Sequence, residues 1–239
     1  MKKTLLESFI KKYSLNGTLE SVKWVAKDKK LHVDTITEDK TVLVKVELKP
    51  FEDFADENLG VHETSRLKGM LAPFGEDVVL TLNKTKDKVT SLVMSAGKLE
   101  GQFACADLDV IASAPSLKGL PDPNCEIILD ATFIEQFIKA KASLPEVDTF
   151  TLLTKKDKVY LVLGHSKLNT CRQTLEVAST GTIEKPISFS AKFFKEILTA
   201  NSDCTASNLK VSDKGLAIAE FENDNFKCSY YMVTIKMDE

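Results

Sequence analysis

Long apolar runs, clustered histidines and paired cysteines are all scarce in this sequence of 239 residues. No stretch approaches the roughly 18 apolar residues that a membrane helix needs, so we expect no membrane partner. Glu7 and Lys11 interrupt the apolar stretch at the N-terminus, which argues against an export signal. The five cysteines are odd in number and form no CxxC pair, which is typical of free thiols in a reducing compartment. We therefore expect a soluble intracellular protein.

Signatures of catalysis are also lacking. The three histidines are dispersed and none has the spacing of metal ligands, so neither a metal nor a cofactor is expected. The sequence has no GxSxG, no GxGxxG and no glycine loop that cradles phosphate. The most site-like tripeptide, Gly164-His165-Ser166, falls at a predicted strand end and is better interpreted as a turn. We expect no enzyme, although a hydrolase triad assembled from distant segments stays open.

The composition indicates a folded protein with nearly balanced charge. Hydrophobic residues make up 43% of the chain and charged residues 28%, which is enough for the core of one large domain or two ordinary ones. The formal net charge of -3 excludes a polycation that coats nucleic acid with its whole surface. Any basic surface must therefore be local and arranged by the fold.

Four segments share one layout, in which a short strand, a tight Lys/Asp turn and a second strand follow one another. These predicted β-hairpins span residues 21–36, 77–94, 148–164 and 208–221. The last two hairpins repeat the spacing of the first two, and a proline-bearing stretch, residues 108–124, separates the pairs.

The repeat predicts two tandem domains of similar size. We place the first at residues 1–112 and the second at 125–239, with a connector at 113–124 that lies over a surface. Further strands are expected in four segments, residues 41–48, 102–106, 174–178 and 226–236.

A predicted helix precedes every hairpin, and each carries one apolar stripe with the opposite side polar. The stripe residues are Leu5, Leu6, Phe9 and Ile10; Phe133, Ile134, Phe137 and Ile138; and Phe193, Phe194, Ile197 and Leu198. The second helix has Leu67, Met70 and Leu71 at the same spacing, with Arg66 in place of the fourth apolar residue and flanking the stripe. Asp130 and Ser190 stand at N-cap positions, and Thr64 is the candidate cap of the second helix. The predicted fold class is α+β: antiparallel sheets with two helices per domain on one side.

The polar faces of these helices carry cations away from the predicted core. They are Lys3, Lys11, Lys12, Arg66, Lys68, Lys139, Lys141, Lys192 and Lys195. A lysine-bearing solvent face is the commonest helix surface, and Glu7, Glu135 and Glu196 share these faces. Lys141 lies near the apolar stripe, where it can instead snorkel from the core. These charges alone do not establish a DNA surface.

This layout resembles that of the DNA polymerase sliding clamps, in particular those of T-even-type bacteriophages and proliferating cell nuclear antigen. Residues 59–62 (Leu-Gly-Val-His), Thr64, Ser65 and Lys68, followed by residues 76–82, look like the strand–helix–strand centre of a clamp's first domain. Residues 133–164 and 187–236 resemble the second domain. The resemblance covers nearly the whole chain and is weakest at residues 38–58.

The resemblance implies the DNA clamp fold and a closed homotrimer whose helices line a hole threaded by duplex DNA. The cations named above would face the phosphates without sequence preference. The implied partners are double-stranded DNA, a DNA polymerase and a clamp loader. The location would be the host cytoplasm if a phage encodes the chain.

By analogy with clamps, a strand near residues 98–105 would pair with one near 169–177 of the neighbouring copy. The analogy also places a partner-peptide pocket at Leu117 and Leu120 in the connector and at Tyr231 and Val233 near the C-terminus. Both features have alternatives: ordinary strands of a monomer, and apolar residues that merely anchor a loop.

Two rival functions are open. One is a protein-interaction scaffold, clamp-like or unrelated to clamps, that never encircles DNA. The other is a monomeric processivity factor that binds DNA through charge alone and shows steep salt dependence.

Overall fold

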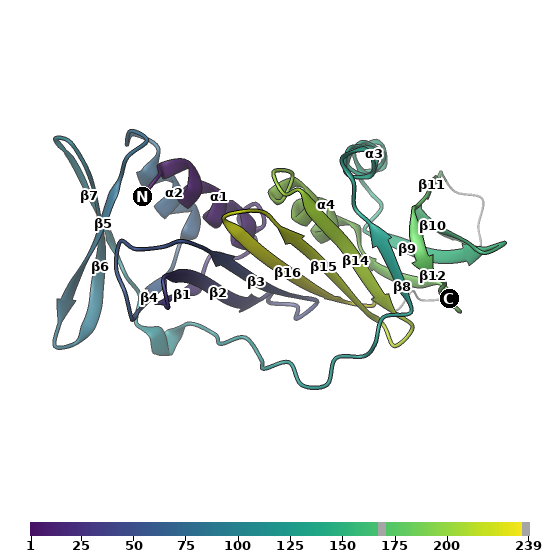
Figure 1. The fold of residues 1–239 in the computed structure, drawn as a ribbon, viewed down its shortest axis with the longest axis horizontal. Coiled ribbons are helices and arrows are strands. Elements are labelled where there is room, and N and C mark those ends of the chain that lie inside the picture. The colour runs from purple at the N-terminus through teal and green to yellow at the C-terminus, as the bar shows by residue number, and fades with distance from the viewer. Residues whose placement is uncertain (167–170, 236–239) are drawn as a thin grey trace. The chain divides into compact units, whose positions relative to one another are not determined.

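The computed structural model describes residues 1–166 and 171–235, which form two compact units (Figure 1). The first unit comprises Met1–Thr37, Leu43–Pro115 and Asp224–Cys228. The second comprises Glu38–Val42, Ser116–Asn223 and the described residues from Ser229 onward. The main division therefore falls within the predicted connector, while the domain limits at 112 and 125 stay predictions.

The first unit contains two helices and seven strands within the described chain. Its helices are α1 (Lys3–Ser14) and α2 (Thr64–Leu71). Its strands are β1 (Val22–Lys27), β2 (Lys30–Ile36), β3 (Val42–Leu48), β4 (Glu57–Val61), β5 (Val79–Thr85), β6 (Lys88–Ala96) and β7 (Leu99–Ala104). The strands are hydrogen-bonded in the orders β4-β1-β2-β3 and β5-β6-β7.

The second unit repeats this plan. Its helices are α3 (Ala131–Ser143) and α4 (Ala191–Ala200). Its strands are β8 (Cys125–Ile128), β9 (Thr149–Lys155), β10 (Lys158–Leu163), β11 (Gln173–Glu176), β12 (Ser179–Gly181), β13 (Ile187–Ser190), β14 (Ala206–Ser212), β15 (Leu216–Glu222) and, from Ser229 onward, β16 (Phe226–Val233), whose first three residues belong to the first unit. They are ordered β12-β8-β14-β15-β16 and β11-β10-β9-β13. The predicted α+β class is confirmed.

All four predicted hairpins form, and three turn on a pair of residues with positive φ: Asp28 and Lys29, Lys86 and Asp87, and Lys156 and Asp157. Two successive residues with positive φ match the right-handed twist of the flanking strands. The fourth hairpin turns at Gly215, with a φ of 87°. The strand predicted at 226–236 ends at Val233, and residue 236 lies outside the described residues.

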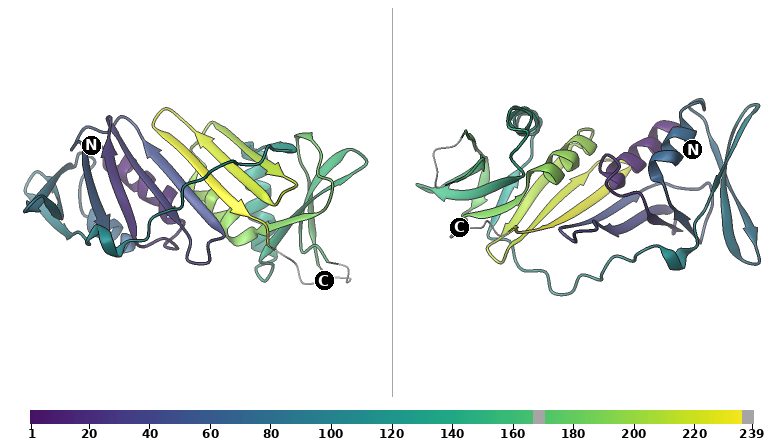
Figure 2. Two further views of the ribbon diagram at one scale, coloured as in Figure 1. Left: turned by 90° about the horizontal axis from the view of Figure 1, so that it is seen from below. Right: turned by 180° about the vertical axis from the view of Figure 1, so that it is seen from behind.

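The predicted apolar stripes cover sheet faces in both units. In the first, Phe9 and Tyr13 of α1 pack edge-on against Trp24 of β1, with ring centroids 5.5 and 6.3 Å apart. Figures 1 and 2 show α1 and α2 side by side on the same face of the β1–β4 strands. Burial raises the pKa of Tyr13 because a phenolate at this position would lack the hydration that it has in water.

In the second unit, α3 and α4 meet over a cluster of phenylalanines. Phe150 of β9 lies at its centre, with ring centroids 5.8 Å from Phe137, 5.7 Å from Phe189 and 4.8 Å from Phe194. Phe137 and Phe194, from the two helices, are 4.9 Å apart in an edge-on contact. This cluster fixes both helices on the β9 face of the sheet.

The helix starts confirm two of the three predicted caps. Asp130 accepts a hydrogen bond from the Phe133 amide, and Ser190 accepts one from the Phe193 amide. Thr64 instead is the first helical residue of α2, and its hydroxyl donates to the Glu20 carbonyl. The Glu20 carboxylate accepts from the Ser65 amide at 2.8 Å, so a side chain from another segment satisfies this helix start.

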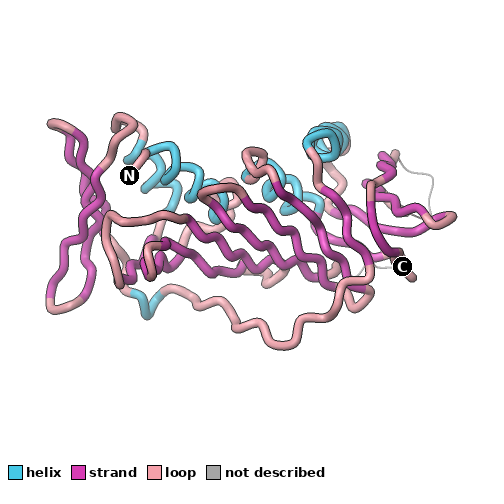
Figure 3. The backbone as a smooth tube through the Cα atoms, viewed as in Figure 1, coloured by secondary structure: helices cyan, strands magenta, loops and turns pink. Residues whose placement is uncertain are grey.

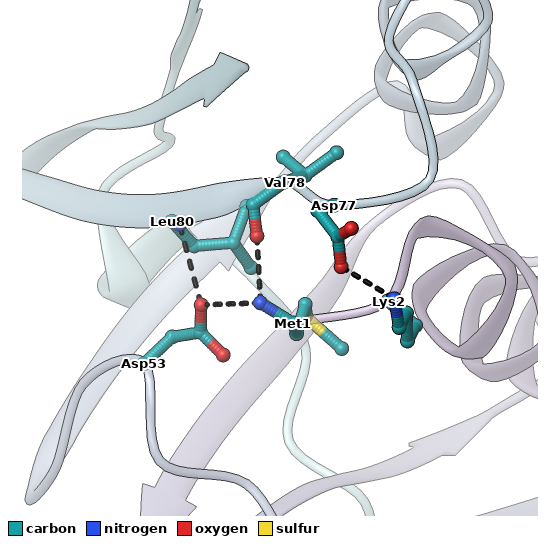
Figure 4. Close-up of polar contacts among 6 residues, drawn as sticks. All are labelled: Met1, Lys2, Asp53, Asp77, Val78 and Leu80. Atoms are coloured by element: carbon teal, nitrogen blue, oxygen red, sulfur yellow. Dashed lines mark hydrogen bonds and ion pairs between the residues drawn. The ribbon is translucent and has the colours of Figure 1, made fainter. Parts of the chain in front are cut away.

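Polar contacts hold the start of α1 to the start of β5 (Figure 4). The amino group of Met1 donates to Asp53 Oδ1 at 3.1 Å and to the Val78 carbonyl at 2.6 Å. The Lys2 ammonium donates to Asp77, and this hydrogen bond lowers the pKa of Asp77. These contacts attach the helix to the sheet of β5, β6 and β7.

The connector is fixed within each unit. Ahead of it, the Ala106 amide donates to the Gly60 carbonyl at 2.9 Å, and a Cβ on Gly60 would lie 2.4 Å from the Ala106 oxygen. Only glycine permits this approach. After a short 3₁₀ turn, η1 (Leu108–Val110), the chain continues as loop (Figure 3). At its end the Asn124 amide donates to the Val211 carbonyl at 2.8 Å.

Replacing Phe150 with alanine tests the packing of the second unit. We expect the free energy of unfolding in urea, followed by circular dichroism, to fall by about 3–5 kcal/mol because the cavity lies at the centre of the cluster. The control, Val110→Ala, truncates a side chain that is 76% exposed and should change stability by less than about 0.5 kcal/mol. Equal effects of the two substitutions would contradict the described core.

Candidate nucleic-acid interface

Six of the nine predicted cations lie at least partly exposed on the helices. In the first unit these are Lys11, Arg66 and Lys68; in the second they are Lys139, Lys192 and Lys195. The apolar stripe of each helix is turned to a sheet, so the cations occupy the remaining face. Each unit thus presents a cationic helix surface.

Ion pairing divides these six cations into two kinds. Arg66 pairs with Glu63 at 3.0 Å and Lys139 with Glu135 on the next turn. The hydrogen bond from Lys139 lowers the pKa of Glu135. Lys11, Lys68, Lys192 and Lys195 have no ion-pair partner in residues 1–166 and 171–235, although the Lys192 ammonium lies 6.0 Å from the centre of the Phe193 ring. Lys11, Lys68 and Lys195 are therefore available to an external anion without breaking an internal contact.

The structure places the other three predicted cations away from open solvent. Lys12 is fully buried, and its ammonium lies 4.9 Å from the centre of the Phe226 ring. Lys141 is 8% exposed and donates to the carbonyls of Leu144 and Pro145, just beyond the end of α3. Lys3 is half-buried and donates to the carbonyls of Ala72 and Phe74, just beyond α2.

These contacts give Lys3 and Lys141 a structural role. Both satisfy carbonyls at a helix C-terminus, where a cation also interacts favourably with the helix dipole. A helical projection gave the direction of each side chain but not its depth, which depends on segments distant in sequence. We therefore remove Lys3, Lys12 and Lys141 from the proposed DNA-facing set.

The predicted peptide-pocket residues all belong to the second unit. Along β16, Tyr230 and Met232 are buried, while Tyr231 is half-buried and Val233 is 43% exposed. The buried Tyr230 hydroxyl accepts from Asn201 at the end of α4, so Tyr231 and Val233 lie on the opposite face of the strand. Leu117 is half-buried, and Leu120 is 43% exposed. From residue 116 the connector passes along the sheet side away from α4 (Figures 1 and 2).

Sequence reasoning missed a hollow of about 150 Å³ on the second unit. It is lined by Leu153, Lys155, Tyr160, Val162, His165, Arg172 and Thr174. Only the pairing register of β9, β10 and β11 brings these residues together. The one signal in the sequence was that Tyr160 and Val162 are two residues apart on a predicted strand, which places their side chains on the same face.

The described residues show neither a membrane-spanning helix nor a metal centre. No helix within them is long and apolar enough to cross a membrane. In the same part of the chain no three histidine, cysteine, aspartate or glutamate side chains are grouped to hold a metal ion.

The sequence matches no protein-family model and no curated protein. Its structure is similar to proliferating cell nuclear antigen (PCNA) of A. fulgidus bound to the C-terminal region of FEN-1, with a TM-score of 0.76 and 16% identity. That match covers 100% of this chain and 98% of the other. The PCNA of Entamoeba histolytica gives a TM-score of 0.75 and 19% identity, covering 98% and 96% of the chains.

The chain has the PCNA clamp fold. The likeness extends from end to end of both proteins, so it includes both units and not one shared module. At this identity the likeness establishes the fold alone.

Lys141 and Lys139, two residues apart on α3, test the distinction between structural and surface cations. Lys141→Met should lower the free energy of unfolding in urea by about 1–2 kcal/mol, because two carbonyls lose a charged donor. Lys139→Met removes a side chain that is 73% exposed, and should change stability by less than about 0.5 kcal/mol. Similar losses for both variants would show that Lys141 has no special role.

Proposed function

We propose that this chain is a sliding clamp for DNA replication: a closed homotrimer that encircles duplex DNA and tethers a DNA polymerase. The PCNA clamp fold over the whole chain is the observation that carries the proposal. The helix pairs of the repeated units would line the hole, and the sheets would form the outer shell. The proposed role needs no catalytic group.

A processivity factor must hold DNA without stopping on it. A closed ring does this by topology, because it stays on the duplex even if every phosphate contact is weak. The unpaired Lys11, Lys68 and Lys195 would supply attraction without sequence preference. The salt-bridged Arg66 and Lys139 and the nearby Lys192 would add to it. The net charge of -3 is consistent with this, since the cations needed are few and local.

Ring closure would use free strand edges. β7 is an edge strand of the sheet β5-β6-β7, and β11 is an edge strand of β11-β10-β9-β13. An edge strand offers unpaired backbone donors and acceptors to a strand of another copy. We propose that β7 pairs with β11 of the neighbouring subunit. Residues 169 and 170 of the originally predicted segment lie outside the described residues.

The partner surface of the proposed clamp would lie on the second unit. Leu117, Leu120, Tyr231 and Val233 offer partly exposed apolar groups, which suit the anchor residues of a short peptide. The A. fulgidus protein is bound to the C-terminal region of FEN-1. We propose that a polymerase, and a clamp loader in its turn, contact this chain through comparable short segments.

The narrower source assignment stays a prediction from sequence. The two similar structures come from A. fulgidus and Entamoeba histolytica, whereas the sequence resemblance also pointed to T-even-type bacteriophages. In a phage-infected cell the proposed clamp would act in the host cytoplasm. The rival monomeric factor shares the fold and differs in how it stays on DNA.

Retention on circular DNA tests the proposed function. After a clamp loader has placed the protein on a nicked circle, we expect it to co-elute with the DNA in gel filtration and to be released once the circle is linearised. The triple variant Lys11→Gln, Lys68→Gln, Lys195→Gln should still be retained on the circle, because enclosure and not charge holds it.

The control for that experiment is the mass of the protein by sedimentation at micromolar concentration, where a trimer is expected. The proposed ring would be overturned if the protein is a monomer, binds circular and linear DNA equally, and no longer binds either DNA in the triple variant. That outcome would favour the monomeric factor.

Tyr231→Ala tests the partner surface. Truncation should reduce stimulation of the polymerase about tenfold, because an anchoring aromatic side chain contributes strongly to a peptide interface. The sedimentation profile should not change. Ser229→Ala, on the same face of β16, is the matched control. Loss of assembly together with stimulation would assign Tyr231 a structural role.

A further inference from the structure

The free edge of β7 presents its backbone groups in a definite phase. Antiparallel strands alternate between residue pairs that exchange hydrogen bonds and pairs that exchange none. The Cys105 amide donates to the Thr90 carbonyl at 2.9 Å, which continues the register of β6 with β7. Cys105 and every second residue before it are therefore bonded to β6. The residues between them, whose backbone groups face the open edge, are Glu100, Gln102 and Ala104.

The free edge of β11 can be described in the same way. The Val177 amide donates to the Val159 carbonyl at 3.1 Å, and this pair continues the register of β10 with β11. Val177 and every second residue before it are therefore bonded to β10. In β11 the backbone groups that face the open edge belong to Thr174 and Glu176.

These two phases limit how the edges can pair. We take the junction as antiparallel, like the pairings of β7 with β6 and of β11 with β10. Only edge-facing residues can then exchange hydrogen bonds, so the two strands can shift only in steps of two residues. One such register alone sets every residue of β11 opposite a residue of β7. It pairs Thr174 with Gln102 and Glu176 with Glu100.

The same register brings two cysteines together. Continued past the ends of both strands, it sets Cys105 opposite Cys171 in a pair without hydrogen bonds. The Cα atoms of such a pair lie about 4.5 Å apart, and a disulfide requires about 4.4–6.8 Å. The edge goes no further, because the next edge-facing amide, that of Ala106, already donates to the Gly60 carbonyl.

Both cysteines are placed for this contact. Cys105 is half-buried directly after β7, and Cys171 is exposed just ahead of β11. A Cβ on Gly164 would lie 2.4 Å from the Cys171 oxygen, so the chain at Cys171 still runs beside the end of β10. Both side chains are free thiols within one copy of the chain.

We propose that β7 of one copy pairs with β11 of the next in this register, so that each subunit boundary carries a Cys105–Cys171 thiol pair that a small-molecule disulfide oxidises to a covalent bridge. The inference rests on the proposed ring, and it adds the register of the boundary and a redox control of its opening. Oxidation would hold each boundary shut, and reduction would be needed before the ring could open for DNA.

The oxidation consists of two thiol–disulfide exchanges. The Cys171 thiolate attacks a sulfur of oxidised glutathione, which forms a mixed disulfide and releases one glutathione thiolate. The Cys105 thiolate then attacks the Cys171 sulfur and releases the second glutathione. The two protein thiols lose two electrons and two protons, and the two glutathione molecules take them up. Burial raises the pKa of Cys105 to about 11, so the exposed Cys171 reacts first.

Oxidation of the full-length protein tests the thiol pair. At a concentration where sedimentation shows a trimer, oxidised glutathione should produce covalent dimers and then covalent trimers on a non-reducing gel. Proteolytic digestion should release a linked pair of peptides, one with Cys105 and the other with Cys171. Cys105→Ser and Cys171→Ser should each reduce the covalent species at least roughly tenfold. The matched control, Cys204→Ser, changes another half-buried thiol and should have no effect.

A displaced thiol distinguishes this register from the neighbouring ones. Cys171→Ser combined with Gln173→Cys moves the thiol by one step of two residues, to a position diagonal to Cys105. Diagonal positions lie about 7–8 Å apart, which is too far for a disulfide. We expect at least roughly tenfold less covalent trimer than in the unmodified protein. Efficient bridging of this variant, or bridges through other cysteines of the unmodified protein, would overturn the register.

A charge substitution tests the register without thiol chemistry. The register sets Glu100 opposite Glu176, and like charges directly opposite one another destabilise a strand pair. Lys158 donates to Glu176 at 2.6 Å and compensates part of this repulsion. Glu100→Gln should lower the protein concentration at half-assembly by about two- to fivefold. Asp122→Asn, the same charge change in the exposed connector, is the control and should not. An unchanged or higher concentration for Glu100→Gln would overturn the register.

Sedimentation separates this inference from the proposed function. A trimer that forms no bridge between Cys105 and Cys171 would overturn the register and leave the ring standing. A protein that stays monomeric before and after oxidation would overturn both. None of these readouts involves DNA, so the outcome is independent of whether the ring encircles a duplex.

Discussion

The burial of one sheet face beneath two helices is the constraint on which each unit depends. Antiparallel strands leave one face apolar, and a helix with a single apolar stripe is the simplest cover for it. Phe9 against Trp24 in the first unit and Phe194 against Phe150 in the second are the closest aromatic contacts between a helix and a strand. Because the apolar sides of the helices are used in this way, their polar sides are turned outward in both units.

That constraint explains why so much of the fold was predictable. Hairpins and helices were recognised from periods of two and 3.6 residues, which are local properties. The Lys/Asp pairs between apolar segments predicted the strand reversals even without glycine. In three of these turns, two successive residues have positive φ, as a tight hairpin turn requires. The short strands β8, β12 and β13 lack such a pattern. They exist because neighbouring strands supply their hydrogen bonds.

The candidate site was less predictable, and Lys12 shows why. Lys12 directly follows the exposed Lys11, and one residue turns a helix by only 100°, so both side chains project away from the apolar stripe. Its burial depends on Phe226, which is distant in sequence. The caps formed by Lys3 and Lys141 likewise require knowing where a helix ends in space. The basic hollow was invisible for a related reason, because three strands and their register must be known before Lys155 and Arg172 line one space.

The lysines on these helices therefore serve three physical purposes, and the unpaired ones suit DNA best. Buried lysines complete the core or the helix ends, and exposed ion pairs such as Lys139 with Glu135 contribute at most about 1 kcal/mol. The unpaired helix cations remain. At physiological ionic strength the Debye length is about 8 Å, so each acts only on a phosphate that is almost in contact. A surface with so few cations attracts a duplex without holding it in place. In the proposed ring, retention must then come from enclosure. Because the cations attract the duplex without fixing it, the ring remains free to slide along it.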